Sequence, residues 1–289
     1  MSHRERVVSA GDAELLLREW GEGGPPILFW HALGDHTSLQ LVDAAPILVE
    51  EFGYRLIGVD APGFGGSPRL PDERYEIPAL IELAKDLLDT LGLDQVVWAG
   101  SSWGGIIGVQ FAAAHPERLA ALVLIDGGYL DPESDHGASL DEARAFWRAQ
   151  PGWRFPSWEA AVGVARAAFP RWSPGLEEYV RSAYHEENGE VVSTVGPEVY
   201  AAAMYGIDRS PPSRVHPRLG ETGLPVLLLG ATEPPKEGAR RETWRKRFAA
   251  QVPQADVRPV EGAPHLMLEA QPAETAREIG EWLKALPYA

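Results

Sequence analysis

Short, mainly apolar runs alternate with stretches of helical periodicity along the first third of the chain, and this alternation restricts the fold most. Each run holds four to six residues bounded by Gly, Pro or Asp, which is typical of strands buried on both faces of a parallel sheet. We therefore predict an α/β fold with a mostly parallel, doubly wound sheet. The predicted strands are 14–20, 27–30, 55–59, 95–99 and 121–125, and the predicted helices are 39–51, 78–91 and 103–114.

The alternation stops near residue 129 and resumes near residue 221. Between these points, prolines divide the chain into short pieces that we predict to be helices and loops. The α/β pattern then returns, with strands at 226–229 and 257–260 and helices at 237–251 and 273–286. The simplest organisation is one α/β core, residues 1–128 and 221–289, interrupted by a helical cap of residues 129–220.

Composition argues against several classes of partner and cofactor. The formal net charge is −16, whereas nucleic-acid binding needs clustered Lys and Arg. No apolar run approaches the roughly 20 residues of a membrane helix, and the polar N-terminus lacks a signal-peptide core, so we expect a cytoplasmic protein without a membrane partner. There is no cysteine, no metal-ligand spacing and no dinucleotide fingerprint, so we expect no cofactor and no metal. The sequence leaves a homodimer open.

The segment G-S-S-W-G at 100–104 carries the central chemical signal. Its G-x-S-x-G pattern permits a sharp turn from strand to helix that exposes the serine hydroxyl. The pattern alone is weak, but a predicted strand directly precedes it and a predicted helix directly follows it. Ser102 is therefore the candidate nucleophile, and His265, in a loop just past the last predicted strand, is the candidate general base.

A third group must orient the imidazole of His265, and two carboxylates follow predicted strands. Glu233 follows the strand 226–229, and Asp126 follows the strand 121–125. We favour Glu233, because Pro234-Pro235 stiffens the chain after it. Asp126 is the alternative. It ranks below Glu233, because the Gly-Gly pair that follows Asp126 suits a flexible hinge better than a fixed orienting group.

Three further segments accompany the serine motif: H-A-L-G at 31–34, D-A-P-G-F-G-G-S at 60–67 and A-P-H at 263–265. Together the four segments resemble the α/β-hydrolase superfamily over nearly the whole chain. The resemblance implies that the backbone N–H groups of Leu33 and Trp103 form an oxyanion hole, that His31 and His36 lie near the substrate, and that the cap is a helical lid inserted after the sixth strand. The sequence departs from the family pattern at Ala32, where Gly is usual, and at Glu233, where Asp is commoner.

The resemblance, joined to a serine nucleophile, implies hydrolysis through an acyl-enzyme. It excludes the dehalogenases and epoxide hydrolases of the same fold, which use Asp as nucleophile. Aromatic residues are frequent in the cap; they either dock it on the core or line an apolar pocket, for which the candidates are Trp147, Trp153, Trp158 and Trp172. We predict a hydrolase of a carboxylic ester or lactone of a mainly apolar small molecule. The alternatives are a C–C bond hydrolase of ring-cleavage products, a proline-type aminopeptidase and a slow-turnover ligand receptor.

Overall fold

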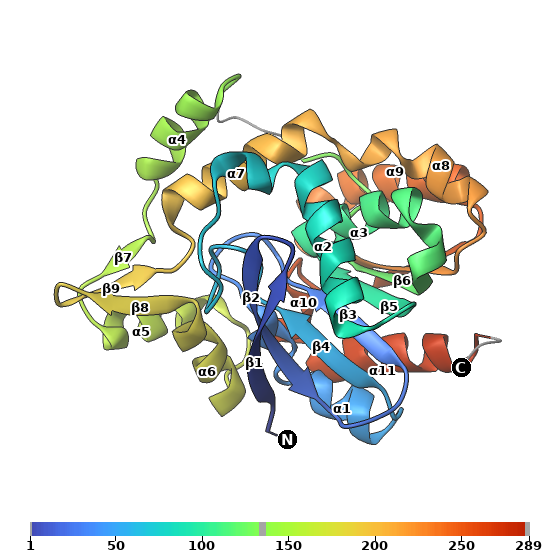
Figure 1. Ribbon diagram of the computed structural model, residues 1–289, viewed down its shortest axis with the longest axis horizontal. Helices are drawn as coiled ribbons and strands as arrows, with labels where there is room; N and C mark the ends of the chain where they lie inside the picture. The colour runs from blue at the N-terminus through green and yellow to red at the C-terminus, as the bar shows by residue number, and fades with distance from the viewer. Residues whose placement is uncertain (1, 133–136, 287–289) are drawn as a thin grey trace.

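Residues 2–132 and 137–286 are described by a computed structural model, centred on an eight-stranded sheet of order β1-β2-β4-β3-β5-β6-β10-β11 (Figure 1). The six strands from β4 to β11 in this order run parallel, and β1 and β2 form an antiparallel hairpin at one edge. The predicted α/β fold with a mostly parallel, doubly wound sheet is confirmed. The strands are β1 (Arg4–Ala10), β2 (Ala13–Trp20), β3 (Pro26–Trp30), β4 (Arg55–Val59), β5 (Val96–Ser101), β6 (Leu119–Ile125), β10 (Val226–Ala231) and β11 (Ala255–Val260).

Helices cover both faces of the sheet, so the central strands are buried on both sides. In β3, Leu28 and Trp30 belong to one apolar core, whereas Ile27 and Phe29 belong to the other. This two-residue alternation explains why the central strands are wholly apolar in sequence. One face carries α2 (Ile77–Leu91), α3 (Trp103–Ala114), α8 (His216–Glu221) and α9 (Pro235–Gln251), and the other α1 (Ala45–Glu50), α10 (Met267–Ala270) and α11 (Pro272–Lys284).

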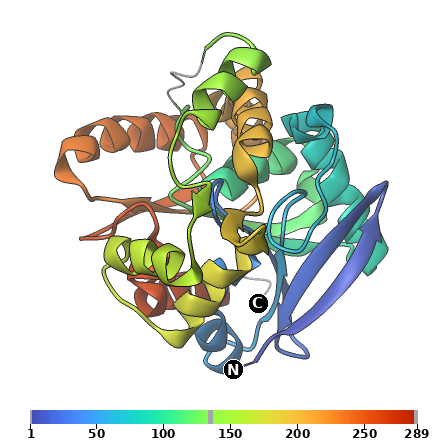
Figure 2. The same cartoon turned by 90° about the vertical axis from the view of Figure 1, so that its left-hand side faces the viewer.

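The chain between β6 and β10 leaves the sheet; we call residues 129–220 the insertion (Figure 2). It contains a small antiparallel sheet that we did not predict. Asn188 and Gly189 form its two-residue turn with φ angles of 52° and 85°, and Asn-Gly is the strongest short signal for such a hairpin. The elements are α4 (Leu140–Arg148), β7 (Arg154–Phe155), α5 (Trp158–Ala168), α6 (Pro174–Ser182), β8 (Tyr184–Glu187), β9 (Glu190–Ser193) and α7 (Gly196–Arg209). The last residues of the insertion begin α8, which packs on the core.

Serine side chains start three of the helices in the insertion. Ser139, Ser157 and Ser173 accept hydrogen bonds from backbone N–H groups in the first turns of α4, α5 and α6. Such caps satisfy donors that a helix start leaves unpaired. Within the described ranges, no helix combines the length and apolar character that crossing a membrane would require.

Candidate active site

The turn from β5 into α3 presents Ser102 at the carboxyl end of the sheet. Its backbone is strained, with φ 50° and ψ −106°, and its N–H donates to the carbonyl of Ile125 on β6 over 3.0 Å. A Cβ at Gly100 would lie 2.2 Å from the carbonyl of Gly104, and one at Gly104 would lie 2.0 Å from the carbonyl oxygen of Trp30. Both glycines of the motif are therefore required by close backbone approach.

His265 lies in the loop after β11 and bridges two side chains that are distant in sequence. Its Nε2 is 2.9 Å from Ser102 Oγ, and its Nδ1 is 2.6 Å from Asp126 Oδ2. With Nδ1–H donating to the carboxylate, Nε2 is left to accept the serine proton. The imidazole side chain is 43% exposed, whereas the Asp126 side chain is 1% exposed. This order of contacts is that of a serine, a base and an orienting acid.

Asp126 directly follows β6 and is held on both oxygens. Oδ1 accepts hydrogen bonds of 2.9 Å from the Tyr129 hydroxyl and from the N–H of Ala231, and Arg241 Nη2 lies 3.8 Å from Oδ2. Burial acts to raise the pKa of the Asp126 carboxyl, but the hydrogen bond from His265, the charge of Arg241 and the other donors hold that pKa below its usual value. Asp126 is therefore a fixed, ionised partner for the imidazole.

The preference for Glu233 over Asp126 is corrected by this geometry. The N–H of Glu233 donates to the carbonyl of Ala263 and its carbonyl accepts from Arg241, while His265 Nδ1 faces Asp126. The premise about a flexible exit after Asp126 also fails. A Cβ at Gly127 would lie 2.1 Å from the Ser102 carbonyl oxygen, so this glycine permits tight packing of the two turns and is no hinge.

The resemblance implied that two backbone donors, the N–H groups of Leu33 and Trp103, serve as the oxyanion hole. Trp103 begins α3, and Leu33 lies in the loop after β3. Within the described part of the chain, neither N–H has a hydrogen-bond acceptor. Ala32 is accommodated, since its φ is not positive, and its N–H donates to Gln40 Oε1 over 3.1 Å. Backbone N–H groups without an acceptor are the kind of donor that an oxyanion hole uses, so both residues stay candidates for that role.

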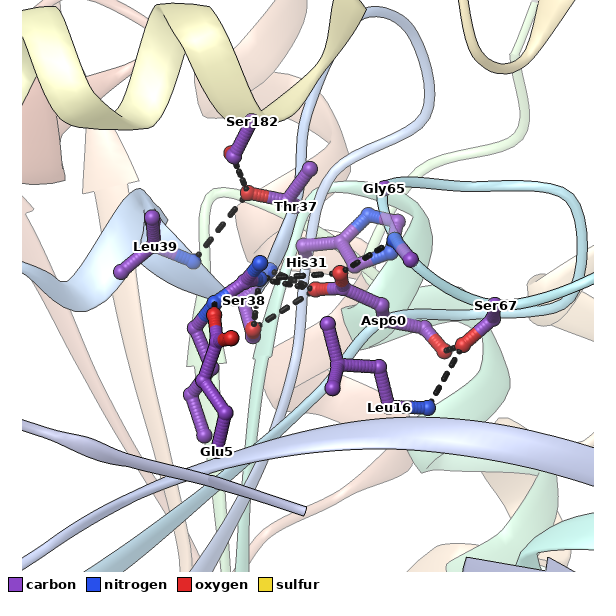
Figure 3. Close-up of polar contacts among 12 residues, drawn as sticks. Glu5, Leu16, His31, Thr37, Ser38, Leu39, Asp60, Gly65, Ser67 and Ser182 are labelled. Atoms are coloured by element: carbon purple, nitrogen blue, oxygen red, sulfur yellow. Dashed lines mark hydrogen bonds and ion pairs between the residues drawn. The ribbon is translucent and has the colours of Figure 1, made fainter. Parts of the chain in front are cut away.

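His31 lies beneath this loop, outside the substrate site where we expected it. It is fully buried, its Nδ1–H donates to the Ala32 carbonyl over 2.7 Å, and its Nε2 accepts from the N–H of Ala61 over 3.1 Å. Burial lowers the pKa of His31 to about 4, so the ring is neutral. Close by, the buried carboxylate of Asp60 binds Arg18 and Ser38 (Figure 3). His31 is thus part of a polar scaffold that supports residues 31–37.

His36 faces the insertion. Its Nδ1 contacts the hydroxyl of Tyr179 on α6, and that hydroxyl donates to Glu269 Oε1 over 3.1 Å. Burial, assisted by the neighbouring His31 and His265, lowers the pKa of His36 to about 3. The ring is therefore a neutral polar link between the 31–37 loop and α6. Neither this link nor Tyr179 was predicted, because the sequence gives no sign of which insertion residue meets the loop.

Two cavities reach His265. One, of about 220 Å³, is lined by Ser102 and Asp126 together with Ile106, Leu130, Arg240 and Arg241. The other, of about 490 Å³, is lined by Phe169, Pro170, Glu233, Pro264 and Leu266. Apolar side chains make up most of the lining of the second cavity, and Glu237 and Arg241 of α9 line both cavities.

None of the four candidate tryptophans lines these two cavities. Trp147 and Trp153 pack on Tyr200, with ring centroids 4.3 and 5.7 Å away. Trp158 donates to Glu186 over 2.6 Å, and Trp172 stacks on Phe169 at 6.2 Å. Their positions therefore fit packing within the insertion, and Phe169 is the aromatic residue that reaches the cavity beside His265.

Residues 25–169, half of the chain, match a family model described as alpha/beta hydrolase fold. A 2-hydroxy-6-oxononadienedioate/2-hydroxy-6-oxononatrienedioate hydrolase of Paraburkholderia phymatum is 41% identical over 76 residues, 26% of each chain. A poly(3-hydroxyalkanoate) depolymerase of Ectopseudomonas oleovorans is 40% identical over 101 residues, 34% of each chain. These matches span about a third of the length of the curated relatives.

Among solved structures, E-2-(acetamidomethylene)succinate hydrolase superposes with a TM-score of 0.79, covering 98% of this chain and 100% of that one. The sequence identity is 23%, so this likeness bears on the fold alone. It extends over the insertion as well as the sheet, whereas the family model stops inside the insertion at residue 169.

Proposed function

Because the chain belongs to the α/β-hydrolase fold family, we propose that it is a serine hydrolase that cleaves a carboxylic ester or lactone of a mainly apolar small molecule. The observation that carries the proposal is the continuous hydrogen-bonded line from Ser102 through His265 to Asp126, with distances of 2.9 and 2.6 Å. Such a line makes a serine hydroxyl nucleophilic at neutral pH.

In the proposed reaction, Ser102 Oγ attacks the substrate carbonyl carbon while His265 Nε2 takes its proton. Asp126 keeps the imidazole in the required tautomer and stabilises the imidazolium that forms. The N–H groups of Leu33 and Trp103 would stabilise the negative oxygen of the tetrahedral intermediate. The imidazolium then gives its proton to the leaving alcohol, and water, activated by the same base, releases the acid from Ser102.

The cavities support a small, mainly apolar substrate. The larger cavity, of about 490 Å³, suits a ligand of modest size, since pockets for small molecules commonly measure about 300–1,000 Å³. The smaller cavity, of about 220 Å³, also reaches His265. Phe169, Pro170 and Leu266 give the larger cavity an apolar wall beside His265. A C–C bond hydrolase is the second candidate, favoured by the similarity to the hydrolase of Paraburkholderia phymatum.

A fluorophosphonate probe and a panel of p-nitrophenyl esters, lactones and vinylogous diketones would test the proposal. We expect one covalent adduct, mapped by mass spectrometry to Ser102, and turnover of at least one ester or lactone. Ser102→Ala should lower kcat by about 10⁴-fold without loss of fold. Ser101→Ala is the matched control, since Ser101 ends β5 and is 1% exposed.

Labelling at Ser101, or no labelling of a folded protein, would contradict the proposed nucleophile. Turnover of the diketones alone would show C–C bond hydrolysis by the same residues in place of ester or lactone hydrolysis. Specific binding of a panel compound without turnover would instead indicate a receptor.

A further inference from the structure

The loop that carries Leu33 is held from outside by the insertion. Asp35 accepts hydrogen bonds from the hydroxyl of Tyr184 on β8, over 2.8 Å, and from that of Ser193 on β9. Thr37 Oγ1 lies 2.7 Å from Ser182 Oγ at the end of α6 (Figure 3). Together with the contact between His36 and Tyr179, three consecutive loop residues each meet a hydroxyl of the insertion.

The loop has little internal support of its own. Within residues 33–36, the one backbone hydrogen bond among the described residues runs from the N–H of His36 to the carbonyl of Gly34, over 2.8 Å. Gly34 has a φ of 125°, a region that only glycine enters readily. A short segment with so few backbone hydrogen bonds keeps one conformation only if its side chains are held.

Among these side chains, Asp35 depends most on its hydrogen bonds to the insertion. Burial raises the pKa of its carboxyl, and the hydroxyls of Ser193 and Tyr184 oppose that rise. Among the described residues, no cation forms an ion pair with it. Asp35 is half-buried. Its carboxylate therefore depends on the two hydroxyls, because a carboxylate with reduced access to water is disfavoured when it loses a hydrogen-bond donor. Asp35 and Leu33 are two residues apart, so a shift of one moves the other.

We propose that the insertion sets the geometry of the oxyanion hole, with Tyr184 and Ser193 acting as positioning residues that hold Asp35 and thereby the N–H of Leu33. This inference rests on the proposed function. It gives the insertion a part in the chemical step, separate from any contact with the substrate. Neither Tyr184 nor Ser193 lines the cavities beside His265.

Tyr184→Phe and Ser193→Ala would each remove one hydroxyl from Asp35. We expect kcat to fall about tenfold in each, with KM within twofold of wild type, because the Leu33 donor is displaced rather than removed and full loss of a donor costs about 10²–10³-fold. Tyr205→Phe is the matched control. Tyr205 lies on α7 under Arg209, and its hydroxyl has no hydrogen-bond partner among the described residues.

The inhibition constant Ki of an aryl trifluoromethyl ketone distinguishes a positioning role from a purely structural one, because a purely structural role would leave Ki unchanged. Ser102 Oγ adds to the carbonyl carbon of this ketone, His265 takes the proton, and the resulting oxyanion sits where the tetrahedral intermediate would. Its Ki should rise about tenfold in both variants, in parallel with the loss of kcat, while Tyr205→Phe keeps both values.

Three results would overturn the inference: unchanged kcat and Ki in folded variants, a raised KM with unchanged kcat, or a lowered melting temperature as the sole effect. Ser193→Ala, the smaller change, decides the matter if Tyr184→Phe does not fold. A wild-type protein that the fluorophosphonate leaves unlabelled would instead contradict the proposed function, so the two failures are distinguishable.

Discussion

Ser102 and Asp126 both adopt a left-handed backbone, with φ angles of 50° and 44°. This region costs a non-glycine residue about 1–3 kcal/mol. Each of the two residues directly follows one of two neighbouring parallel strands, β5 and β6, and Gly127 lets the two turns pack against each other. The strain is thus concentrated where two side chains must project from the sheet towards one imidazole.

The orienting acid gives the first prediction at this scale. Asp126→Asn should lower kcat by up to about 10⁴-fold, because an amide opposite Nδ1 favours the wrong imidazole tautomer. Glu233→Gln should retain activity within a few-fold, because the hydrogen bonds of Glu233 are made by its backbone. Steady-state kinetics, with circular dichroism to verify folding, would measure both. A large loss of kcat in Glu233→Gln, together with an active Asp126→Asn, would assign the role of orienting acid to Glu233.

Local signals in the sequence were enough to place Ser102 and His265 together. The serine motif has to lie between a strand and a helix, and the histidine has to follow the last strand. The local sequence does not decide between Asp126 and Glu233 as the orienting acid, since both follow strands at the same sheet edge. It depends on which carboxylate reaches Nδ1 across space, and on contacts such as that of Ala231 N–H with Asp126.

Among the elements, the buried ones were predictable and the exposed ones were not. Strands β3 to β6 are almost wholly apolar in sequence because both of their faces are covered; Arg55 at the start of β4 and Ser101 at the end of β5 are the exceptions. Strand β1 escaped prediction because it is an edge strand with exposed Arg4 and Glu5. The hairpin of β8 and β9 escaped for a similar reason, since β8 is Y-H-E-E and mostly exposed. An exposed strand carries little hydrophobic pattern.

The insertion supplies the prediction for substrate choice. Phe169→Ala should change the ranking of acyl chains in the p-nitrophenyl panel, because Phe169 lines the cavity of about 490 Å³ beside His265. We expect a gain for larger acyl groups of about tenfold relative to acetate, the scale of a missing methylene or two. Trp158→Ala is the control, because Trp158 contacts Glu186 and Arg181 within the insertion. An altered ranking in Trp158→Ala alone would contradict this prediction.

At the scale of the whole molecule, a buried carboxyl group joins the insertion to the core. Glu269 on α10 is fully buried; its Oε1 accepts from Gln40 and from Tyr179 of α6, while its Oε2 has no partner among the described residues. Burial raises the pKa of Glu269 from 4.5 to about 7, against the effect of these hydrogen bonds. Below about pH 7 the folded protein therefore holds Glu269 mainly as the protonated carboxyl group.

This carboxyl group makes stability depend on pH. A raised pKa in the folded state means that its contribution is fully present below about pH 4.5 and is lost as pH rises through about 7. Glu269→Gln should therefore gain stability relative to wild type between pH 5 and 8, by on the order of 3 kcal/mol at the upper end. Urea denaturation at intervals of pH would measure the difference between the two proteins.

The free energies of unfolding of wild type and Glu269→Gln must be compared with each other at each pH, because His31 and His36 change stability with pH in the opposite direction. Their lowered pKa values mean that their contribution to stability is fully present above about pH 6.5 and is lost as pH falls from there through about 4 for His31 and about 3 for His36. Glu274→Gln, at an exposed position of α11, is the control and should follow wild type. Parallel curves for wild type and Glu269→Gln would show that the buried carboxyl does not govern this dependence.

Strands β6 and β10 lie side by side in the sheet, with Leu122 opposite Val226, so the chain returns from the insertion to the neighbour of the strand it left. In polymer terms, the insertion is a ring whose ends are clamped by the sheet. The entropy of closing such a ring grows only with the logarithm of its length, and doubling a flexible loop costs about 0.6 kcal/mol. Descendants of this chain could therefore lengthen, shorten or exchange the insertion at a small cost in folding free energy. New substrate ranges could evolve in this way while the α/β core stays unchanged.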